Sequence, residues 1–99
     1  MTSKYQVIYW RDIPAQVKAR SGADRGAREL SARFQETIDA AAMISGAAGT
    51  DQYLAGWRTS EWQSAEGGLE SVLDEITAKL EGDYAAERLF ELRAAGGQE

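Results

Sequence analysis

The chain has 99 residues and a net charge of −5, and it contains neither histidine nor cysteine. This length fits one domain, residues 1–99, that can bury a single modest core. Without cysteine there is no disulfide framework or thiolate zinc site, and without histidine the commonest acid–base group at neutral pH is missing. We therefore expect no metal, no cofactor and no enzymatic activity.

Charge is distributed unevenly along the chain. Residues 1–37 hold seven Lys or Arg and four Asp or Glu, a net charge of +3, whereas residues 38–99 hold four and twelve, a net charge of −8. A basic first third suits an acidic partner, while the acidic remainder argues against a nucleic-acid partner. Neither an apolar signal core nor a run of about eighteen apolar residues is present, so we expect a cytoplasmic protein without a membrane partner.

The first predicted elements are two strands joined by a hairpin loop. Residues 4–10 carry apolar side chains on both faces, which is typical of a central strand. Residues 15–20 alternate between apolar and polar side chains, so this second strand has one face in water. The loop between them, residues 11–14, contains the only proline, which fixes its own φ and holds Ile13 near extended geometry.

A helix is predicted over residues 30–45, after a break in the second strand at residues 21–26. Large apolar residues recur every three or four positions, and Gly46 ends the pattern. The stretch before the helix contains two glycines and is polar, which favours a loop that leads directly into the first helical turn.

A short second helix and an edge strand are predicted next. Thr50 or Asp51 can cap the helix. Its expected buried residues are Tyr53, Leu54 and Trp57. Residues 58–66 contain one large hydrophobe and no helical stripe, so they fit a short edge strand, with a loop as the alternative.

Two further helices complete the chain. After Gly67-Gly68 the helical stripe is the sharpest in the sequence, and it consists of Leu69, Val72, Leu73, Ile76 and Leu80. Asp83 is the expected cap of a final helix, whose apolar residues are Leu89, Phe90 and Leu92. This order of elements predicts an α+β fold: a small antiparallel or mixed sheet, made of the hairpin and the edge strand, with three to four helices packed mainly on one face.

The strongest candidate site lies around the hairpin loop. A fork-shaped cation and a carboxylate beside aromatic surface are typical of protein-interaction hot spots. This candidate partner-binding site consists of Tyr9, Trp10, Arg11, Asp12 and Pro14. The structural alternative is that Trp10 belongs to the core, that Arg11 pairs with a local acid, and that Asp12 accepts hydrogen bonds from turn amides.

A second candidate is an anion site formed by Arg20, Arg25 and Arg28. These arginines surround a glycine-containing loop that enters a helix, where free amides and guanidinium groups both favour negative charge. The spacing of Gly22 and Gly26 matches neither a Walker loop nor a dinucleotide fingerprint.

Two tryptophans follow in the middle of the chain. Trp57 is expected in the core, and Trp62 either packs or forms an exposed contact. Neither tryptophan lies in a basic stretch of sequence, so stacking on nucleic-acid bases is not expected.

Residues 4–17 (KYQVIYWRDIPAQV) resemble the start of the bacterial "virulence factor" domain family. Later segments extend the resemblance over most of the chain: residues 29–36 with 38–39, 51–54 with 57–58, and 84–89. This chain has Gly67-Gly68 where family members commonly have Asp or Pro near the start of the third main helix.

The resemblance implies a small accessory protein. The family occurs as stand-alone chains and is similar to the terminal domain of conserved virulence factor C, where it accompanies helical repeats. Relatives are often encoded beside folate- and corrinoid-dependent methyl-transfer enzymes. The expected function is therefore a non-enzymatic interaction module whose partner is a methyltransferase or a methylenetetrahydrofolate reductase. The alternative is a protein that binds a small anion such as a folate or a phosphate metabolite. The resemblance supplies no catalytic residues.

Overall fold

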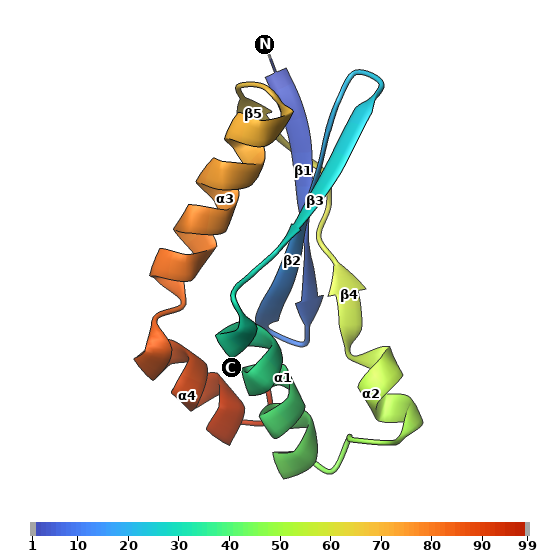
Figure 1. Ribbon diagram of the computed structural model, residues 1–99. Helices are drawn as coiled ribbons and strands as arrows, with labels where there is room; N and C mark the ends of the chain where they lie inside the picture. Colours follow the sequence, from blue (N-terminus) through green and yellow to red (C-terminus); the bar gives the residue numbers. More distant parts are fainter. Residues whose placement is uncertain (1, 99) are drawn as a thin grey trace.

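The computed structural model describes residues 2–98, which form five strands and four helices (Figure 1). In chain order these are β1 Thr2–Trp10, β2 Ile13–Ser21, β3 Asp24–Glu29, α1 Ala32–Ile44, α2 Asp51–Ala55, β4 Trp57–Thr59, β5 Gln63–Glu66, α3 Leu69–Asp83 and α4 Ala86–Ala94. The strands form one antiparallel sheet, which confirms the predicted α+β class. None of the helices in the described part of the chain is both long and apolar enough to cross a bilayer.

The sheet has the order β3-β2-β1-β4, and β5 also pairs with β1. β1 is the central strand, as predicted, because β2 lies along one of its edges while β4 and β5 share the other. β5 pairs with the start of β1 and β4 with its end. The predicted edge strand over residues 58–66 is therefore formed by two short strands separated by a connector that contains Trp62.

The loop between β1 and β2 is shorter than predicted. It consists of Arg11 and Asp12 alone, and both Ile13 and Pro14 belong to β2. Pro14 pairs with Tyr9, and the register shifts at this point so that Ala15 is an extra residue on β2. A bulge is one of the few places where a strand accepts a proline. The predicted loop over residues 11–14 was wrong because Pro14 extends the chain into the strand.

β3 is the element that the sequence did not predict. Instead of a break over residues 21–26, the structure has a tight turn at Gly22 and Ala23 and then a strand. Gly22 has a φ of 61°, which a two-residue hairpin turn requires at its first position. Gly26 lies within the strand because α3 passes close to it: a Cβ there would lie 3.1 Å from a methyl group of Leu73.

The four helices occur where they were predicted, with changes at their ends. The side chain of Thr50 caps α2 as expected, but Leu54 is 69% exposed and Trp57 lies in β4, half-buried. Asp83 is the last residue of α3 and does not cap α4, whose N-cap is Ala85.

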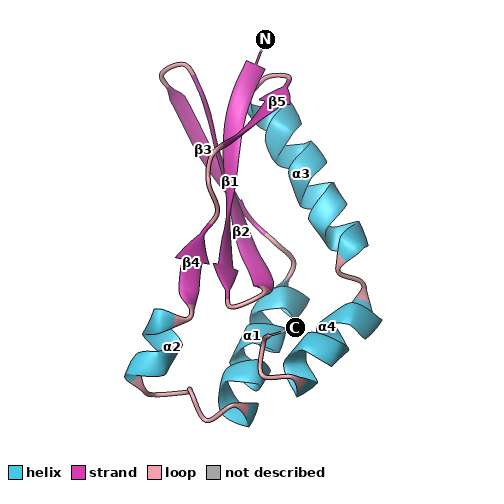
Figure 2. Ribbon diagram, turned by 180° about the vertical axis from the view of Figure 1, so that it is seen from behind, coloured by secondary structure: helices cyan, strands magenta, loops and turns pink. Residues whose placement is uncertain are grey.

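The core lies between the sheet, α3 and the two helices at the lower end of the molecule. α3 crosses one face of the sheet over β2 and β3, while α1 and α4 pack side by side below the sheet (Figures 1 and 2). Val17 and Ala19 of β2 are buried, and so are Val72 and Leu73 of α3. Trp10 and Ile13, at the lower end of the first hairpin, are completely buried, so this end of the hairpin is part of the core.

Candidate functional site

The turn between β1 and β2 is held rigidly by segments from distant parts of the sequence. Arg11 has a φ of 53°, the single positive φ of a non-glycine residue within residues 2–98. This left-handed conformation costs about 1–2 kcal/mol for a residue with a side chain. The N–H of Arg11 donates to the carbonyl of Gly56, and the N–H of Asp12 to that of Gly97, each over 2.8 Å. These two bonds fix the turn in a conformation that it would not adopt alone.

Trp10 lies beneath this turn and is fully buried. Its indole N–H donates to the carbonyl of Tyr53 over 2.8 Å. The backbone passes very close to the ring, since a Cβ at Gly56 would lie 2.6 Å from Nε1 and a Cβ at Gly97 would lie 2.8 Å from Cζ3. The Arg11 guanidinium covers the ring, with its carbon 4.7 Å from the ring centroid.

Two of the five residues predicted to bind a partner are therefore inaccessible. Trp10 is 0% exposed, and Pro14 is among the fully buried side chains. Trp10 is buried because Gly56, at the end of α2, and Gly97, near the C-terminus, close over its ring. Tyr9, Arg11 and Asp12 keep partial exposure. Arg11 also has a structural contact, because its Nη1 donates to the carbonyl of Gly96 over 2.8 Å.

Arg58 of β4 joins these exposed residues. Its Nε donates to the carbonyl of Arg11 over 2.9 Å, and its Nη2 lies 3.4 Å from Oδ1 of Asp12. Its guanidinium carbon lies 4.3 Å from the ring centroid of Tyr9. Half of the Arg58 side chain, 52%, is still exposed. Arg58 is thus held in one orientation while its charge remains available to a ligand.

Two tyrosines and a third arginine border the same surface. Burial raises the pKa of Tyr9, although the nearby Arg58 opposes this shift. Burial also raises the pKa of Tyr84, and the charges that act on it include Arg88 and Asp12. The guanidinium carbon of Arg88 lies 5.8 Å from the Tyr84 ring centroid. Both phenols therefore keep their protons at neutral pH.

We call this surface the turn site. Its members are Tyr9, Arg11, Asp12, Arg58, Tyr84 and Arg88. Two open hollows of about 520 and 350 Å³ lie on it, and Asp12 and Arg58 line both of them. With three guanidinium groups and one carboxylate, the turn site favours an anionic group, and a guanidinium can bind a carboxylate or phosphate through two parallel hydrogen bonds.

The sequence pointed to only half of the turn site. Tyr9, Arg11 and Asp12 were predicted, but Arg58 was not, because the strand pairing that brings it beside Tyr9 is a long-range contact. Arg88 and Tyr84 lie far along the chain near the start of α4, and no pattern in the sequence linked them to the hairpin. Their place at the site depends on the packing of α3 and α4.

The predicted anion site is not formed as one site. Arg20 and Arg25 are direct partners across β2 and β3, whereas Arg28 lies on the other face of the sheet. There it forms ion pairs with Glu70 and Asp74 of α3. Three arginines that belong to two faces of the sheet cannot bind one anion together.

The first turn of α1 already has an anion from the chain itself. The backbone N–H of Ser31 donates to the carboxylate of Glu81 over 2.7 Å, and the Ser31 hydroxyl donates over 2.9 Å. Arg33 contacts the same carboxylate. Burial raises the pKa of Glu81, but these hydrogen bonds and the Arg33 charge outweigh it and lower the pKa overall. An amide at the start of α1, where free amides were expected to favour an anion, is thus occupied by Glu81.

The two other tryptophans have different environments. Trp57 is half-buried and packs edge-to-face with Tyr53, with ring centroids 6.1 Å apart. Trp62 is 36% exposed, and the guanidinium carbon of Arg20 lies 4.3 Å from its ring centroid. Trp57 therefore packs against the core as expected, and Trp62 combines packing with exposure.

Comparison with known proteins supports the family resemblance. A family model described as virulence factor matches residues 8–92. No curated protein and no solved structure matches the chain. The matched range includes every member of the turn site.

Proposed function

The chain belongs to the virulence factor family, and from that premise we propose that it is a non-enzymatic interaction module that binds another protein through the turn site. The observation that carries the proposal is that the Arg58 side chain is held in one orientation and is also exposed. Its guanidinium is fixed by Tyr9, by Asp12 and by the Arg11 carbonyl, yet half of the side chain is exposed. An arginine that is ordered before binding loses less conformational entropy when it binds.

The chemistry of the turn site indicates what the partner presents. Guanidinium groups beside tyrosine rings are frequent at the centres of protein interfaces. The two hollows share Arg58 and Asp12, so a partner side chain in either of them would meet this pair. We expect the partner to contribute an Asp or Glu side chain to Arg58, together with a donor to Asp12.

The partner that we propose is an enzyme of methyl transfer. The resemblance described above places relatives of this family beside folate- and corrinoid-dependent methyltransferases, and a methylenetetrahydrofolate reductase is a second candidate. The absence of histidine and cysteine from the whole sequence supports an accessory role in place of a catalytic one.

The test is direct binding between the purified chain and a purified methyltransferase or methylenetetrahydrofolate reductase from the same genome, measured by calorimetry. Arg58→Gln removes the charge and keeps much of the side-chain length, so it is expected to weaken binding at least tenfold. Lys79→Gln is the matched control, since it removes a cation from the exposed side of α3. Equal binding by the intact chain and the Arg58 variant would exclude the turn site.

The alternative function is the binding of a small anion by Arg58 in one of the two hollows of the turn site. Titration with folates and phosphate metabolites separates the two cases. If a folate binds the intact chain with measurable heat and Arg58→Gln abolishes that binding, the turn site binds a small ligand and not a protein.

A further inference from the structure

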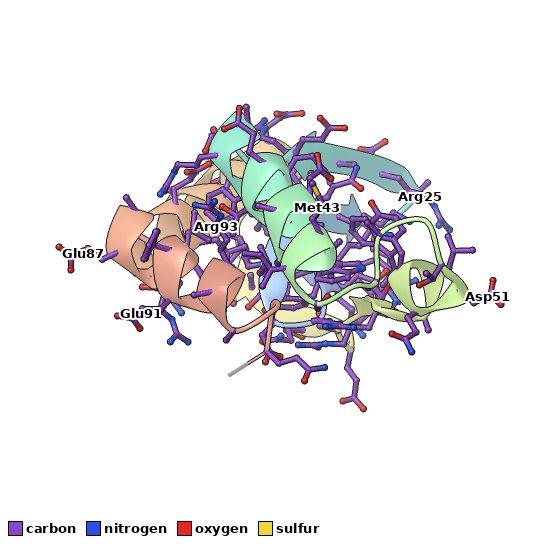
Figure 3. The ribbon with its side chains drawn as sticks, turned by 90° about the horizontal axis from the view of Figure 1, so that it is seen from below. Arg25, Met43, Asp51, Glu87, Glu91 and Arg93 are labelled. Carbon is purple, nitrogen blue, oxygen red and sulfur yellow. The ribbon has the colours of Figure 1, made fainter. Side chains whose placement is uncertain are left out.

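The free edge of β3 has a geometry that suits a second copy of this chain. β3 pairs with β2 on one side, and no strand within residues 2–98 lies on its other side. Its outer residues are exposed, and Figure 3 shows Arg25 at the periphery of the molecule. An uncovered strand edge presents unpaired backbone groups to any chain that can match them.

The hydrogen bonds between β2 and β3 show which backbone groups of β3 are unpaired. The N–H of Leu30 donates to the carbonyl of Ala15 over 3.0 Å, so these two residues form a hydrogen-bonded pair. Such pairs alternate along an antiparallel ladder. Every second residue of β3 therefore directs its backbone N–H and C=O toward β2. The remaining residues direct theirs away from the sheet: Arg25, Ala27 and Glu29.

The two charged residues of this edge have no opposite charge directly across from them on β2. Arg25 lies directly opposite Arg20 of β2, and Glu29 lies opposite Gln16. Neither Arg25 nor Glu29 forms an ion pair within the part of the chain that the structure describes. Like charges directly opposite each other destabilise a sheet, so a carboxylate opposite Arg25 on its free side would offset the repulsion from Arg20.

Only one antiparallel register matches this edge to its own copy. A two-fold axis through Ala27 pairs all three outward residues and places each Arg25 opposite Glu29 of the second copy. A shift by two residues places Arg25 opposite Ala27 and loses the charge pairs. A shift by four places Arg25 opposite Arg25, or Glu29 opposite Glu29, which is repulsive.

The other face of β3 accommodates the same register. There Arg28 would lie opposite Gly26 of the second copy, which has no side chain to compete for space. Arg28 forms ion pairs with Glu70, over 2.8 Å, and with Asp74, so its guanidinium is already held toward α3. Charged residues on an edge strand normally prevent strand pairing. Here their order makes the edge complementary to itself.

We propose that two copies of this chain associate through their β3 edges, antiparallel about Ala27, to form one continuous sheet. The interface consists of the outward backbone groups of β3 and two ion pairs between Arg25 and Glu29. It leaves the turn site free, since the members of that site lie on the β1–β2 hairpin, on β4 and near the start of α4, and none of them lies on β3. A six-residue strand is a small interface, so the dimer is expected to dissociate on dilution.

Analytical ultracentrifugation of the full chain, from low micromolar to millimolar concentration, tests this proposal. A monomer–dimer equilibrium is expected, and hydrogen exchange should show that the amides of Arg25, Ala27 and Glu29 become protected as the dimer forms. A monomer at every concentration would overturn the proposal. So would a dimer in which these three amides stay unprotected.

Charge exchange tests the register. Arg25→Glu turns two opposite pairs into like pairs, so it should raise the dissociation constant roughly tenfold. The double variant Arg25→Glu/Glu29→Arg should restore dimerisation. Lys4→Glu reverses a charge on β1, which lies at the centre of the sheet, and should leave dimerisation unchanged. If the double variant dimerised as weakly as Arg25→Glu alone, the proposed register would be refuted.

A proline tests the backbone contacts. The N–H of Ala27 points away from β2, so Ala27→Pro removes no hydrogen bond within the chain but should abolish the dimer. Circular dichroism checks that the variant is folded, and the charge exchange remains decisive if it is not.

Discussion

Gly56→Ala is predicted to destabilise the protein through the buried Trp10. Gly56 has a φ of −73°, which alanine adopts without strain, so the backbone gives no reason for glycine at this position. The reason is steric, because the new Cβ would lie 2.6 Å from Nε1 and 2.8 Å from Cε2 of Trp10. The ring cannot move easily, since its N–H is bonded to Tyr53 and Gly97 lies against its far edge.

The expected loss of stability is the one that results when a closed core is overpacked. Forcing extra atoms into such a site typically costs about 1–3 kcal/mol. For a domain of this size each kcal/mol lowers the Tm by about 4–8 °C, so a decrease of about 4–24 °C is expected. The assay is thermal unfolding followed by circular dichroism, with acrylamide quenching of tryptophan fluorescence to detect exposure of the indole.

Gly82→Ala is the matched control for this prediction. Gly82 lies within α3, and a Cβ there would meet nothing within 4 Å. Alanine is the better helix former, so this variant should raise stability by up to about 1 kcal/mol. If Gly56→Ala were as stable as the intact protein while Gly82→Ala behaved as expected, the account of a tightly closed Trp10 site would be refuted.

Two further predictions concern Glu81 and Arg11. The lowered pKa of Glu81 means that the unfolded chain binds a proton more readily than the folded chain, so its contribution is complete above the unfolded value near 4.5 and is lost as the pH falls through the lower folded pKa. Glu81→Gln should therefore reduce the acid dependence of the Tm between pH 5 and pH 3, and an unchanged profile would contradict this. Arg11→Ala should lower stability by about 1 kcal/mol, because it removes the hydrogen bond to Gly96 and the cover over Trp10. A stability equal to that of the intact chain, measured by urea unfolding, would show that Arg11 has no structural role.

The contacts of Arg11 explain why its variants are poor probes of binding. A substitution there changes the C-terminal turn, the surface over Trp10 and the exposed charge together. Arg58 is the better probe, since its partners are a carbonyl and two side chains at the surface. A loss of binding in an Arg58 variant can therefore be assigned to the turn site itself.

The charge asymmetry of the sequence places basic residues on the strands and acidic residues on the later helices. Glu87 and Glu91 of α4 point away from the body of the protein (Figure 3). Five of the seven Lys and Arg residues of the basic first third lie on β1, β2 and β3, while Arg11 lies in the turn between β1 and β2 and Arg33 lies in α1. Both proposed interfaces use an exposed arginine of the sheet, Arg58 of β4 in the turn site and Arg25 of β3 at the sheet edge.

The sequence by itself determined the local elements of this protein. The apolar residues on both faces of residues 4–10 predicted the central strand, and the stripe from Leu69 to Leu80 predicted α3, because periodicity reports which faces are buried. Because periodicity reports only burial, the prediction failed at residues 21–26, where β3 begins. β3 is short, polar and at an edge, so it has little buried surface to leave a pattern.

Only the tertiary structure decided which residues meet at the turn site and at the β3 edge. The burial of Trp10 depends on Gly56 and Gly97, and the position of Arg58 depends on β4 pairing with β1. Such contacts join residues that are far apart in the sequence, and no local propensity encodes them. They form because the hairpin and the helices bury more apolar surface together than either can bury alone.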